Sequence, residues 1–312
     1  MMVIMTNATL ARTDSEMPKA SLLDISQAQK ERLSHIDFKV CFLGTIGRTD
    51  LINRFGIKAA AATRDITLYK ALAPHNLGYD TKSKVYTRSE SFESLFDYSP
   101  NQALAALVHG FGDDFVGAHK GFVACETPAQ LNKPSLATLS GLTRAIHQGK
   151  AVRVTYRSLS SGRSTREIVP FVLVDNGLRW HVRAYDRKQL RFADFVITRI
   201  SEPVIIDGPI KEHEIREFDI QWNRIVELEI VPHPSLKHPK TIETDYAMEN
   251  GVLKVNVRAA VAGYVLRRWN VDCSKAHSLV GPEYHLWLKN KQALYGVENL
   301  VIAPGYNKDE TK

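Results

Sequence analysis

Arginine dominates one stretch of this 312-residue sequence, and arginine is the side chain best suited to bind a planar anion. Residues 141–206 contain twelve Lys and Arg against five Asp and Glu, and ten of the twelve cations are arginine. The difference of +7 equals the net charge of the whole chain. A guanidinium fork binds carboxylate or phosphate through two parallel hydrogen bonds. The stretch therefore predicts a receptor for something anionic; the alternative is that these arginines only solvate a small domain.

A second group of chemistry-bearing residues lies in the segment RTDLINRFGIKAAAATRDITLY, residues 48–69. Phe55-Gly56-Ile57 has the composition of the turn in a helix-turn-helix motif. The small and basic residues that follow suit a major groove, where alanine and threonine methyl groups contact thymine and arginine binds guanine or phosphate. Lysines in the next polar loop suit a wing on backbone phosphates. The residues predicted to contact DNA are Arg48, Thr49, Lys58, Ala59, Ala60, Thr63, Arg64, Lys82 and Lys84.

The elements that must position these residues follow the order of a winged helix domain. Apolar spacing and capping residues predict helices over about residues 26–43, 49–55 and 58–72. A polar loop between Tyr79 and Val85-Tyr86 predicts a β-hairpin after them. An ordinary alanine-rich helical hairpin is the alternative, but it does not account for a β-hairpin in this place.

The arginine-rich stretch itself is predicted to be a helix followed by strands. Leu139, Leu142 and Ile146 have helical spacing, and Gly149 ends that helix. Apolar and polar residues then alternate with a period of two, and Asn176-Gly177 is a strong hairpin signal. The predicted strands cover residues 152–157, 168–174, 179–185, 190–197 and 200–206. One helix and five short strands with tight turns predict a small Sm- or SH3-like barrel.

Residues 140–206 resemble the WYL domain. The likeness rests on Val154-Thr155-Tyr156, Arg166-Glu167-Ile168-Val169-Pro170, the run Arg179–Asp186 and the closing Arg191-Phe192 and Thr198-Arg199-Ile200. The Trp-Tyr-Leu tripeptide that names the domain is here Trp180-His181-Val182. Outside this domain, the phrases RFGI, TRDI and AGYVLRRW are similar to those of WYL repressors encoded beside phage-defence loci of the BREX and CBASS type.

This resemblance implies a homodimer that binds an inverted repeat and senses a small or nucleic-acid-derived ligand in the WYL domain. Carried over by position, the ligand-facing residues are Tyr156, Ser158, Arg166, His181, Arg183 and Arg191. Such a set suits a nucleotide or oligonucleotide, held by phosphate forks and stacking. The imidazole of His181 is expected to charge near pH 6.5, so that anion affinity rises on acidification. Trp180 is expected in the core.

The chain as a whole is predicted to be a multidomain α+β protein. Beyond residue 220, strands are expected at 225–231, 252–257, 276–280 and 284–288, with a helix at 263–269. The expected division is a disordered tail (1–24), a winged helix-turn-helix (25–98), a helical linker (99–138), the WYL barrel (139–207) and a small C-terminal dimerisation domain of the WCX type (220–308).

Other kinds of site find little support in the sequence. No P-loop, GxSxG, HExxH or dinucleotide fingerprint is present, so no catalytic residue, cofactor or enzymatic activity is predicted. His233 and His238 have a spacing that suits a metal ion, but without a third ligand a solvated loop is the better interpretation. Three scattered cysteines, with no run long enough to span a bilayer, favour a cytoplasmic, nucleoid-associated bacterial protein without membrane contact.

The predicted function is therefore a transcriptional repressor that binds double-stranded DNA at a palindromic operator and is controlled by an anionic effector. Two alternatives stay open. One is an accessory protein that binds RNA or single strands through the arginine-rich domain, and the other is a transcriptional activator.

Overall fold

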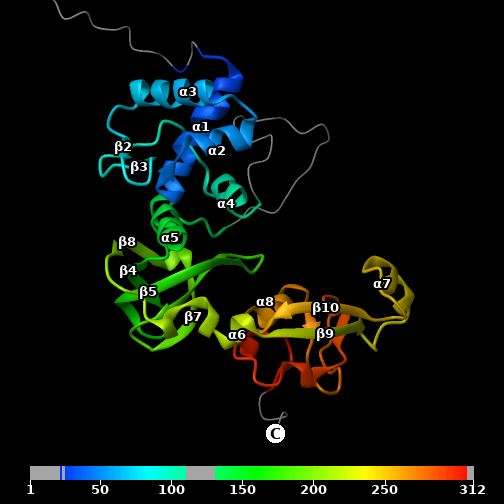
Figure 1. Ribbon diagram of the computed structural model, residues 1–312. Coiled ribbons are helices and arrows are strands. Elements are labelled where there is room, and N and C mark those ends of the chain that lie inside the picture. Colours follow the sequence, from blue (N-terminus) through cyan, green and yellow to red (C-terminus); the bar gives the residue numbers. More distant parts are fainter. Residues whose placement is uncertain (1–21, 23–24, 110–130, 308–312) are drawn as a thin grey trace, which may run out of the picture. The chain divides into compact units, whose positions relative to one another are not determined.

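The computed structural model describes residues 22, 25–109 and 131–307 (Figure 1). The expected disordered tail lies outside the described residues except for Leu22, and so do residues 110–130 of the expected linker. The described residues form two compact units, one up to Asp97 and one from Tyr98 onward. Each unit mixes helices with an antiparallel or mixed sheet, as predicted for a multidomain α+β chain.

The first unit has the helix–helix–helix–hairpin order of a winged helix domain. Its elements are α1 (Gln27–Leu43), β1 (Thr45–Ile46), α2 (Arg48–Phe55), α3 (Ala59–Leu72), β2 (Leu77–Asp80) and β3 (Val85–Arg88). Ser26 caps α1 by accepting the backbone N–H of Gln29, and Gly44 ends α1 in the left-handed conformation. The three helices and the hairpin predicted from the sequence are confirmed. Strand β1, which completes the sheet order β1-β3-β2, has no signal in the sequence.

Gly56 makes the turn between α2 and α3. Its φ of 63° lies in the left-handed region, which glycine adopts at little cost, and its N–H donates to the carbonyl of Ile52 at 2.9 Å. Leu51 on α2, together with Ala62 and Ile66 on α3, is buried in the core below this turn. Because these residues anchor one side of α3, the opposite side of the helix is left exposed.

The second unit begins with α4 (Pro100–His109) and α5 (Leu136–Gln148), followed by a five-stranded antiparallel sheet. Its strands are β4 (Ala151–Ser158), β5 (Gly162–Asp175), β6 (Trp180–Asp186), β7 (Arg191–Val196) and β8 (Ile200–Ile206). Helix α5 packs on β5 and β8, with Leu139 and Leu142 buried, and Gly149 ends it as predicted. Trp180 is also buried, as expected.

The strand order of this sheet is β7-β6-β5-β4-β8. Strands β7 and β8 form its two edges, and no pairing between them is found in the described part of the chain. The five strands are therefore confirmed, whereas the closed Sm- or SH3-like barrel expected from their number is not shown. Strand β5 is also much longer than predicted, because its polar first half from Gly162 pairs with β4.

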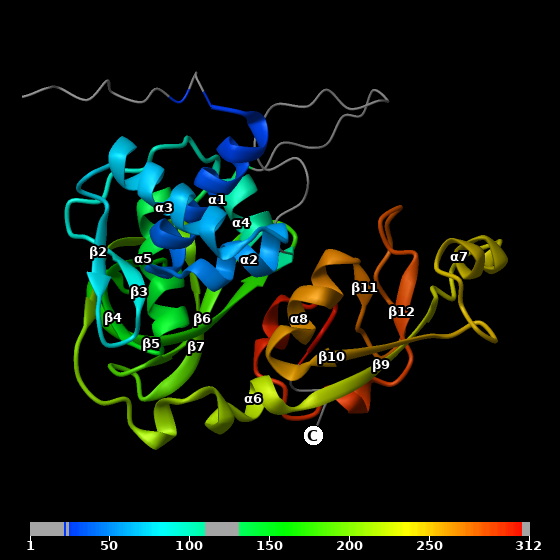
Figure 2. The same ribbon diagram turned by 45° about the horizontal axis from the view of Figure 1, so that its top comes forward.

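The C-terminal part of the second unit is a small α+β assembly, drawn in yellow to red in Figure 1. Its elements are α6 (Ile220–Asn223), β9 (Ile225–Pro232), α7 (Pro239–Asp245), β10 (Leu253–Arg258), α8 (Ala259–Arg268), β11 (Val271–Asp272), β12 (Leu286–Leu288) and η7 (Asn299–Ile302). The strand order is β10-β9-β12-β11. Figure 2 shows α8 beside β9 and β10, and its Ala262 and Leu266 share a buried core with Leu228 and Ile230.

Two sequence predictions for this part are wrong. Residues 276–280, predicted as a strand, form no regular structure, because the N–H groups of Ser278 and Leu279 donate to the side chains of Ser274 and Asp272 rather than to another strand. His233, predicted in a solvated loop, is only 1% exposed: its Nδ1 lies 2.7 Å from Ser235 Oγ and its Nε2 lies 3.3 Å from Asp272 Oδ2. A histidine with hydrogen-bond partners on both ring nitrogens is satisfied in a core, and the sequence did not reveal the distant partner.

Candidate functional site

The nine residues predicted to contact DNA are all exposed on the first unit. Arg48 and Thr49 begin α2, while Lys58, Ala59, Ala60, Thr63 and Arg64 occupy the start and the first two turns of α3. No ion pair engages Arg48, Lys58 or Arg64 within the described ranges. The structure thus presents basic and small side chains together on the outer side of the second helix of the motif.

Asp65 holds α3 in place, a role that the sequence prediction missed. Its carboxylate is buried and accepts Arg32 Nε at 2.6 Å and Gln29 Nε2 at 3.2 Å, both from α1. Asp65 directly follows Arg64, so the helix turns one inward and the other outward. The signal was present in the phrase TRDI, where a charged residue stands at an inward position of the helix beside Ile66.

A buried polar network fixes the far end of α3. The Tyr69 hydroxyl donates to Asp37 Oδ1 at 2.6 Å and accepts Asn76 Nδ2 at 3.0 Å. Burial, reinforced by the neighbouring Asp37 carboxylate, raises the pKa of Tyr69 far above its usual value, so the phenol remains a donor. Because Asn76 immediately precedes the hairpin, this network ties the wing to the helix that carries Arg64.

The tip of the wing is shaped by one aspartate. Asp80 accepts the backbone N–H of Lys82 at 2.9 Å and the hydroxyl of Ser83 at 2.5 Å, and the Ser83 hydrogen bond lowers the pKa of Asp80. Lys84 has a φ of 57°, a left-handed conformation that the tight tip requires. Lys82 and Lys84 are both exposed, so the wing presents two ammonium groups at its end.

The six residues predicted to face a ligand do not form one cluster. Val154 pairs with Arg166 and Ile168 pairs with Asp186 across neighbouring strands. Successive residues of a strand point to opposite faces, whereas residues paired across strands share a face. Tyr156 and Arg166 therefore lie on the face of Asp186, while His181 and Arg183 lie on the other. The spacing predicted alternation within each strand but not the register between strands.

On the first face, Arg166 forms an internal ion pair with Asp186. Its Nη1 lies 2.6 Å from Asp186 Oδ2, and both side chains are almost fully buried. Tyr156 is also buried, with its ring edge-on to Phe195 at 5.0 Å between centroids. Ser158 is half-buried near the strand end and contacts Ser160. These contacts stabilise the domain and leave Arg166 with no open approach.

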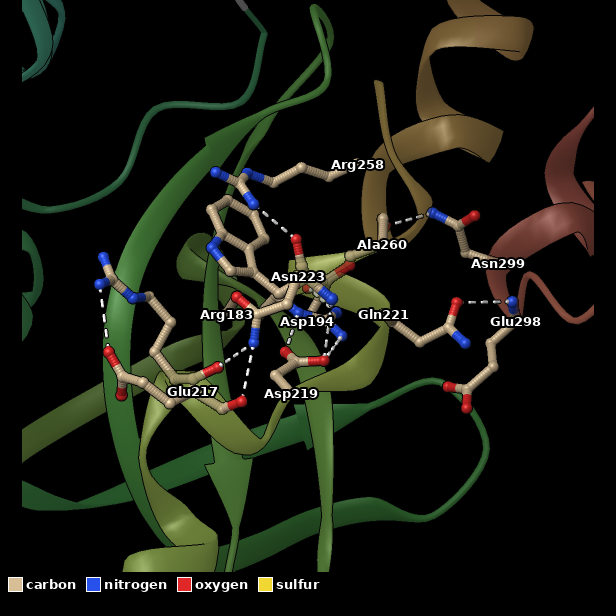
Figure 3. Close-up of polar contacts among 12 residues, drawn as sticks. Arg183, Asp194, Glu217, Asp219, Gln221, Asn223, Arg258, Ala260, Glu298 and Asn299 are labelled. Atoms are coloured by element: carbon tan, nitrogen blue, oxygen red, sulfur yellow. Dashed lines mark hydrogen bonds and ion pairs between the residues drawn. The ribbon is translucent and has the colours of Figure 1, made fainter. Parts of the chain in front are cut away.

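Arg183 on the second face and Arg191, which begins the edge strand β7 opposite Asp186, line an open pocket of about 270 Å³. Arg183 lies between two carboxylates, as Figure 3 shows. Its Nε and Nη2 donate to Asp219 at 2.6 and 3.0 Å, and its Nη1 donates to Asp194 at 2.9 Å. Tyr264 of α8 donates its hydroxyl to the other oxygen of Asp194 at 2.9 Å. The remaining lining comes mainly from the C-terminal part of the unit.

His181 lies beside this pocket under the ring of Tyr264. The two rings stack at 5.0 Å with an angle of 26° between them. His181 is 2% exposed, and its Nδ1 has no hydrogen-bond partner among the described residues. Burial lowers the pKa of His181, and the nearby Arg179 and Arg199 lower it further, against the attraction of Asp194. The expectation that this imidazole charges near pH 6.5 is therefore wrong: its charged form is disfavoured.

The same internal pairing recurs over the arginine-rich stretch. Arg187 donates to Glu214 through two nitrogens at 2.8 Å, and Arg153 binds Glu167 at 2.9 Å. Net charge thus overstated the number of guanidinium groups available to a ligand. The sequence could not reveal Asp219 and Tyr264 as site residues, because they lie far along the chain; Tyr264 does belong to the phrase AGYVLRRW that carries the family resemblance.

Gly263, next to Tyr264, permits the close packing behind the pocket. A Cβ on this residue would collide with the backbone carbonyl of Asn299 in η7. Its N–H donates to Asn299 Oδ1 at 3.0 Å, and Asn299 Nδ2 donates to the carbonyl of Ala260 at 2.5 Å. Figure 3 shows the hydrogen bond between Asn299 and Ala260. Ala260, Tyr264 and Asn299, which line the pocket, are thereby held together.

The described residues contain neither a metal site nor a membrane-spanning helix. No group of three or more His, Cys, Asp or Glu in residues 25–109 and 131–307 is arranged to hold a metal ion. Over the same ranges, no helix combines the length and the apolar character needed to cross a bilayer.

Comparison with known families matches three segments of this chain. Residues 28–107 match the BrxR transcriptional regulator winged helix-turn-helix domain, residues 137–205 match the WYL domain, and residues 225–294 match the BrxR transcriptional regulator C-terminal dimerization domain. All three fall in the order expected from the sequence resemblance.

Curated relatives span nearly the same length. The chain is 33% identical over 282 residues to the DNA-binding transcriptional repressor CapW of Escherichia coli (strain KTE188), covering 86% of this chain and 91% of the relative. It is also 33% identical over 282 residues to CapW of Pseudomonas aeruginosa, covering 85% and 90%.

Among solved structures, proteasome accessory factor B/C (PafBC) of Arthrobacter aurescens is 16% identical, with a TM-score of 0.24 over 83% of this chain and 47% of that one, a likeness too low to carry an argument. Family membership rests instead on the three matched domains and on the CapW relatives. The chain belongs to the BrxR and CapW family of transcriptional regulators, which join a winged helix-turn-helix, a WYL domain and a C-terminal dimerization domain.

Proposed function

We propose that this protein is a homodimeric, DNA-binding transcriptional repressor that acts on an inverted-repeat operator in the bacterial cytoplasm. The observation that carries the proposal is the outer side of α3, where Lys58, Thr63 and Arg64 are exposed and Asp65 anchors the helix from behind. An exposed helix of this kind enters a major groove, where arginine contacts guanine. The CapW relatives, named DNA-binding transcriptional repressors, favour repression over activation.

The wing supplies the second DNA contact in this proposal. Lys82 and Lys84 stand at the tip of the hairpin that follows α3, with ammonium groups free of ion pairs within the part of the chain that the structure describes. Contacts to phosphates add affinity and fix the register on the duplex without reading sequence. Base contacts come from α3 and backbone contacts from the wing.

The experiment is a titration of the full chain with labelled duplexes from the intergenic region upstream of its own gene cluster. We expect nanomolar-range binding, on the order of 10 nM at physiological salt, to a duplex with an inverted repeat. Binding to a duplex with the same composition but a scrambled repeat is expected to be at least about a thousandfold weaker. Equal affinity for both duplexes would remove sequence-specific repression from this proposal. A promoter fusion then separates repression from activation.

Dimerisation is proposed through the C-terminal part of the second unit, expected from the sequence to span residues 220–308. The support is the match of residues 225–294 to a dimerization domain. Two copies place two recognition helices about one turn of DNA apart, which requires a half-site spacing of about 10 base pairs. Sedimentation of the full chain at micromolar concentration tests this; a monomer that still binds one half-site would contradict it.

Control by an anionic ligand is proposed at the pocket on the second face of the WYL sheet. Two members of the predicted set, Arg183 and Arg191, line it, and His181 lies beside it with an unsatisfied nitrogen. Arg166 and Tyr156 are proposed to support the sheet rather than to contact the ligand, and Ser158 lies at its end. The ligand class is a nucleotide or short single strand, whose phosphate suits a guanidinium.

The test of ligand control uses the operator duplex with mononucleotides and short single strands as competitors. Release of the operator by an anionic compound, lost in Arg191→Gln, supports the pocket. Arg191 is chosen because it is exposed and its removal leaves no buried carboxylate without a partner. Release that is unchanged in Arg191→Gln would place control elsewhere. Tight binding of single strands without any duplex binding would favour the accessory-protein alternative.

A further inference from the structure

Arg183 holds, in its fork, a carboxylate from another part of the chain. Asp219 accepts Nε and Nη2 at 2.6 and 3.0 Å, the two parallel bonds by which arginine binds a carboxylate or phosphate ligand. Both side chains are almost fully buried. The position that an anionic ligand would take on Arg183 is thus occupied by the protein's own carboxylate (Figure 3).

Asp219 has a second function at the beginning of α6. Its Oδ1 also accepts the backbone N–H of Trp222 at 3.0 Å and so caps this short helix. Helix α6 leads directly into β9, the central strand of the C-terminal sheet with β12. Loss of the Arg183–Asp219 pair would therefore affect α6, which connects the WYL sheet to the C-terminal part.

Trp222 is held from both sides of this connection. Its ring lies edge-on to Phe171 of β5, with 5.7 Å between centroids, and the Arg258 guanidinium lies 4.7 Å from its centroid. Arg258 Nη1 donates to the Trp222 carbonyl at 2.7 Å, and Arg258 is the N-cap residue of α8.

These contacts form a closed circuit that joins the WYL sheet, the segment around α6 and helix α8. From Arg183 they run to Asp219, through Trp222 and Arg258 to α8, and from Tyr264 on α8 back to Asp194, which binds Arg183 again. Two carboxylates face one guanidinium, so this group of three carries a net charge of −1. An incoming anion meets repulsion unless one carboxylate leaves.

We propose that Asp219 is a built-in competitor for the anionic ligand: a phosphate or carboxylate that binds Arg183 displaces Asp219, uncaps α6 and loosens residues 216–224. This inference rests on the ligand control proposed above and names its mechanism. Asp219 is the carboxylate that leaves, because it lies outside the sheet, directly before α6, whereas Asp194 is fixed on the strand paired with Arg183. Ligand binding would then reduce the order of residues 216–224, the segment that leads into the C-terminal part.

The experiment measures hydrogen exchange of the full chain with adenosine 5′-monophosphate as the probe and uncharged adenosine as its matched control, at constant ionic strength. We expect the monophosphate, and not adenosine, to accelerate exchange in peptides covering residues 216–224. Binding of the monophosphate without any change in this segment would overturn the proposal.

Two variants test the competition itself. Asp219→Asn keeps a side-chain oxygen for the Trp222 N–H but removes the charge, and we expect it to bind the monophosphate about tenfold more tightly, the scale of one charged hydrogen bond. Glu217→Gln removes an equal charge from an exposed neighbour and is expected to bind like the wild type. Binding by Asp219→Asn that is no tighter than by the wild type, including no binding by either, overturns the competition.

The variant Arg183→Lys tests the same role from the other partner, in case Asp219→Asn has a folding defect. Lysine keeps the positive charge between Asp194 and Asp219 but lacks the fork. We expect the monophosphate to lose its effect on residues 216–224 in this variant, while thermal unfolding stays cooperative; an unchanged effect overturns the role of the fork. The titrations contain no DNA, so they fail or succeed independently of operator binding, which the duplex assay measures in the same preparations.

Discussion

Arg64 on α3 and Arg183 on β6 have contrasting surroundings. Arg64 is exposed, and no ion pair engages it in the described parts of the first unit. Arg183 is 5% exposed and bound by two aspartates from different segments. The first unit thus leaves Arg64 exposed on its predicted recognition helix, whereas the arginine-rich sheet pairs Arg166 and Arg183 with buried carboxylates of the same unit. Local net charge therefore does not measure how much charge a surface offers.

The internal use of arginine is tested most strongly by Arg166→Met. This change leaves the Asp186 carboxylate buried without its counterion, and a broken buried pair costs about 3–5 kcal/mol of the free energy of unfolding. Urea unfolding of the second unit measures it. Arg153→Met, which removes an exposed pair with Glu167, is the matched control and is expected to cost less than about 1 kcal/mol. Equal losses would abolish the contrast between structural and available arginines.

The external use of arginine is tested by Arg64→Ala. Loss of one base contact costs about 1–3 kcal/mol, or roughly a 5- to 150-fold weaker affinity for the operator duplex. Fluorescence anisotropy measures the affinity. Arg267→Ala removes an exposed arginine from α8 of the second unit and is expected to leave operator binding unchanged. If both variants bind like the wild type, α3 is not the recognition helix.

Burial lowers the pKa of one histidine in each unit, His35 in the first and His181 in the second, and His35 lets the effect of acid on stability be measured. Burial, with the Arg54 and Lys39 charges, lowers the pKa of His35 to about 3. The unfolded chain binds a proton below about pH 6.5 that the folded chain does not, so stability present above that pH is lost as the pH falls.

We expect the first unit to lose about 1 kcal/mol of unfolding free energy between pH 7.0 and 5.5 through this group. His35→Gln should remove that part of the loss, and His75→Gln, at an exposed histidine, should not. Denaturant unfolding at the two pH values measures it. An unchanged pH dependence in His35→Gln would show that this imidazole does not resist protonation.

The smallest expected effect belongs to the wing. Lys82→Gln should reduce the slope of log affinity against log salt concentration by about 1 and weaken specific and scrambled duplexes alike, because phosphate contacts carry no sequence information. Lys275→Gln, in the second unit, is the control and should leave the slope unchanged. A wing variant that lowers only specific binding would instead assign base reading to the hairpin.

Local signals predicted most of the fold. Ser26, Gly44, Gly56 and Gly149 mark helix ends in both sequence and structure, because caps and left-handed turns depend on neighbouring residues only. Strand β1 escaped prediction because two residues carry no period. The strand expected at 276–280 does not form, because N–H groups of this segment donate to the side chains of Ser274 and Asp272. The composition of the segment itself gives no sign of these partners.

The two candidate sites differ in how far the sequence could describe them. Seven of the nine residues predicted to contact DNA lie within one short motif, residues 48–69, so helical periodicity alone separates outward Arg64 from inward Ile66. The residues predicted to face a ligand come from several strands, and which of them share a face depends on the register between strands. Moreover, the partner of Arg183 lies 36 residues away in Asp219. Long-range pairing of this kind has no local pattern from which it can be predicted.

Because Gly263 has no side chain, α8 packs closely against η7 behind the pocket. Glycine inside a helix costs about 1 kcal/mol relative to alanine, so Gly263→Ala should help α8 as an isolated helix. In the folded chain the added methyl group would force α8 and η7 apart at Asn299. Since Ala260, Tyr264 and Asn299 line the same pocket, one added carbon behind them is expected to change its volume.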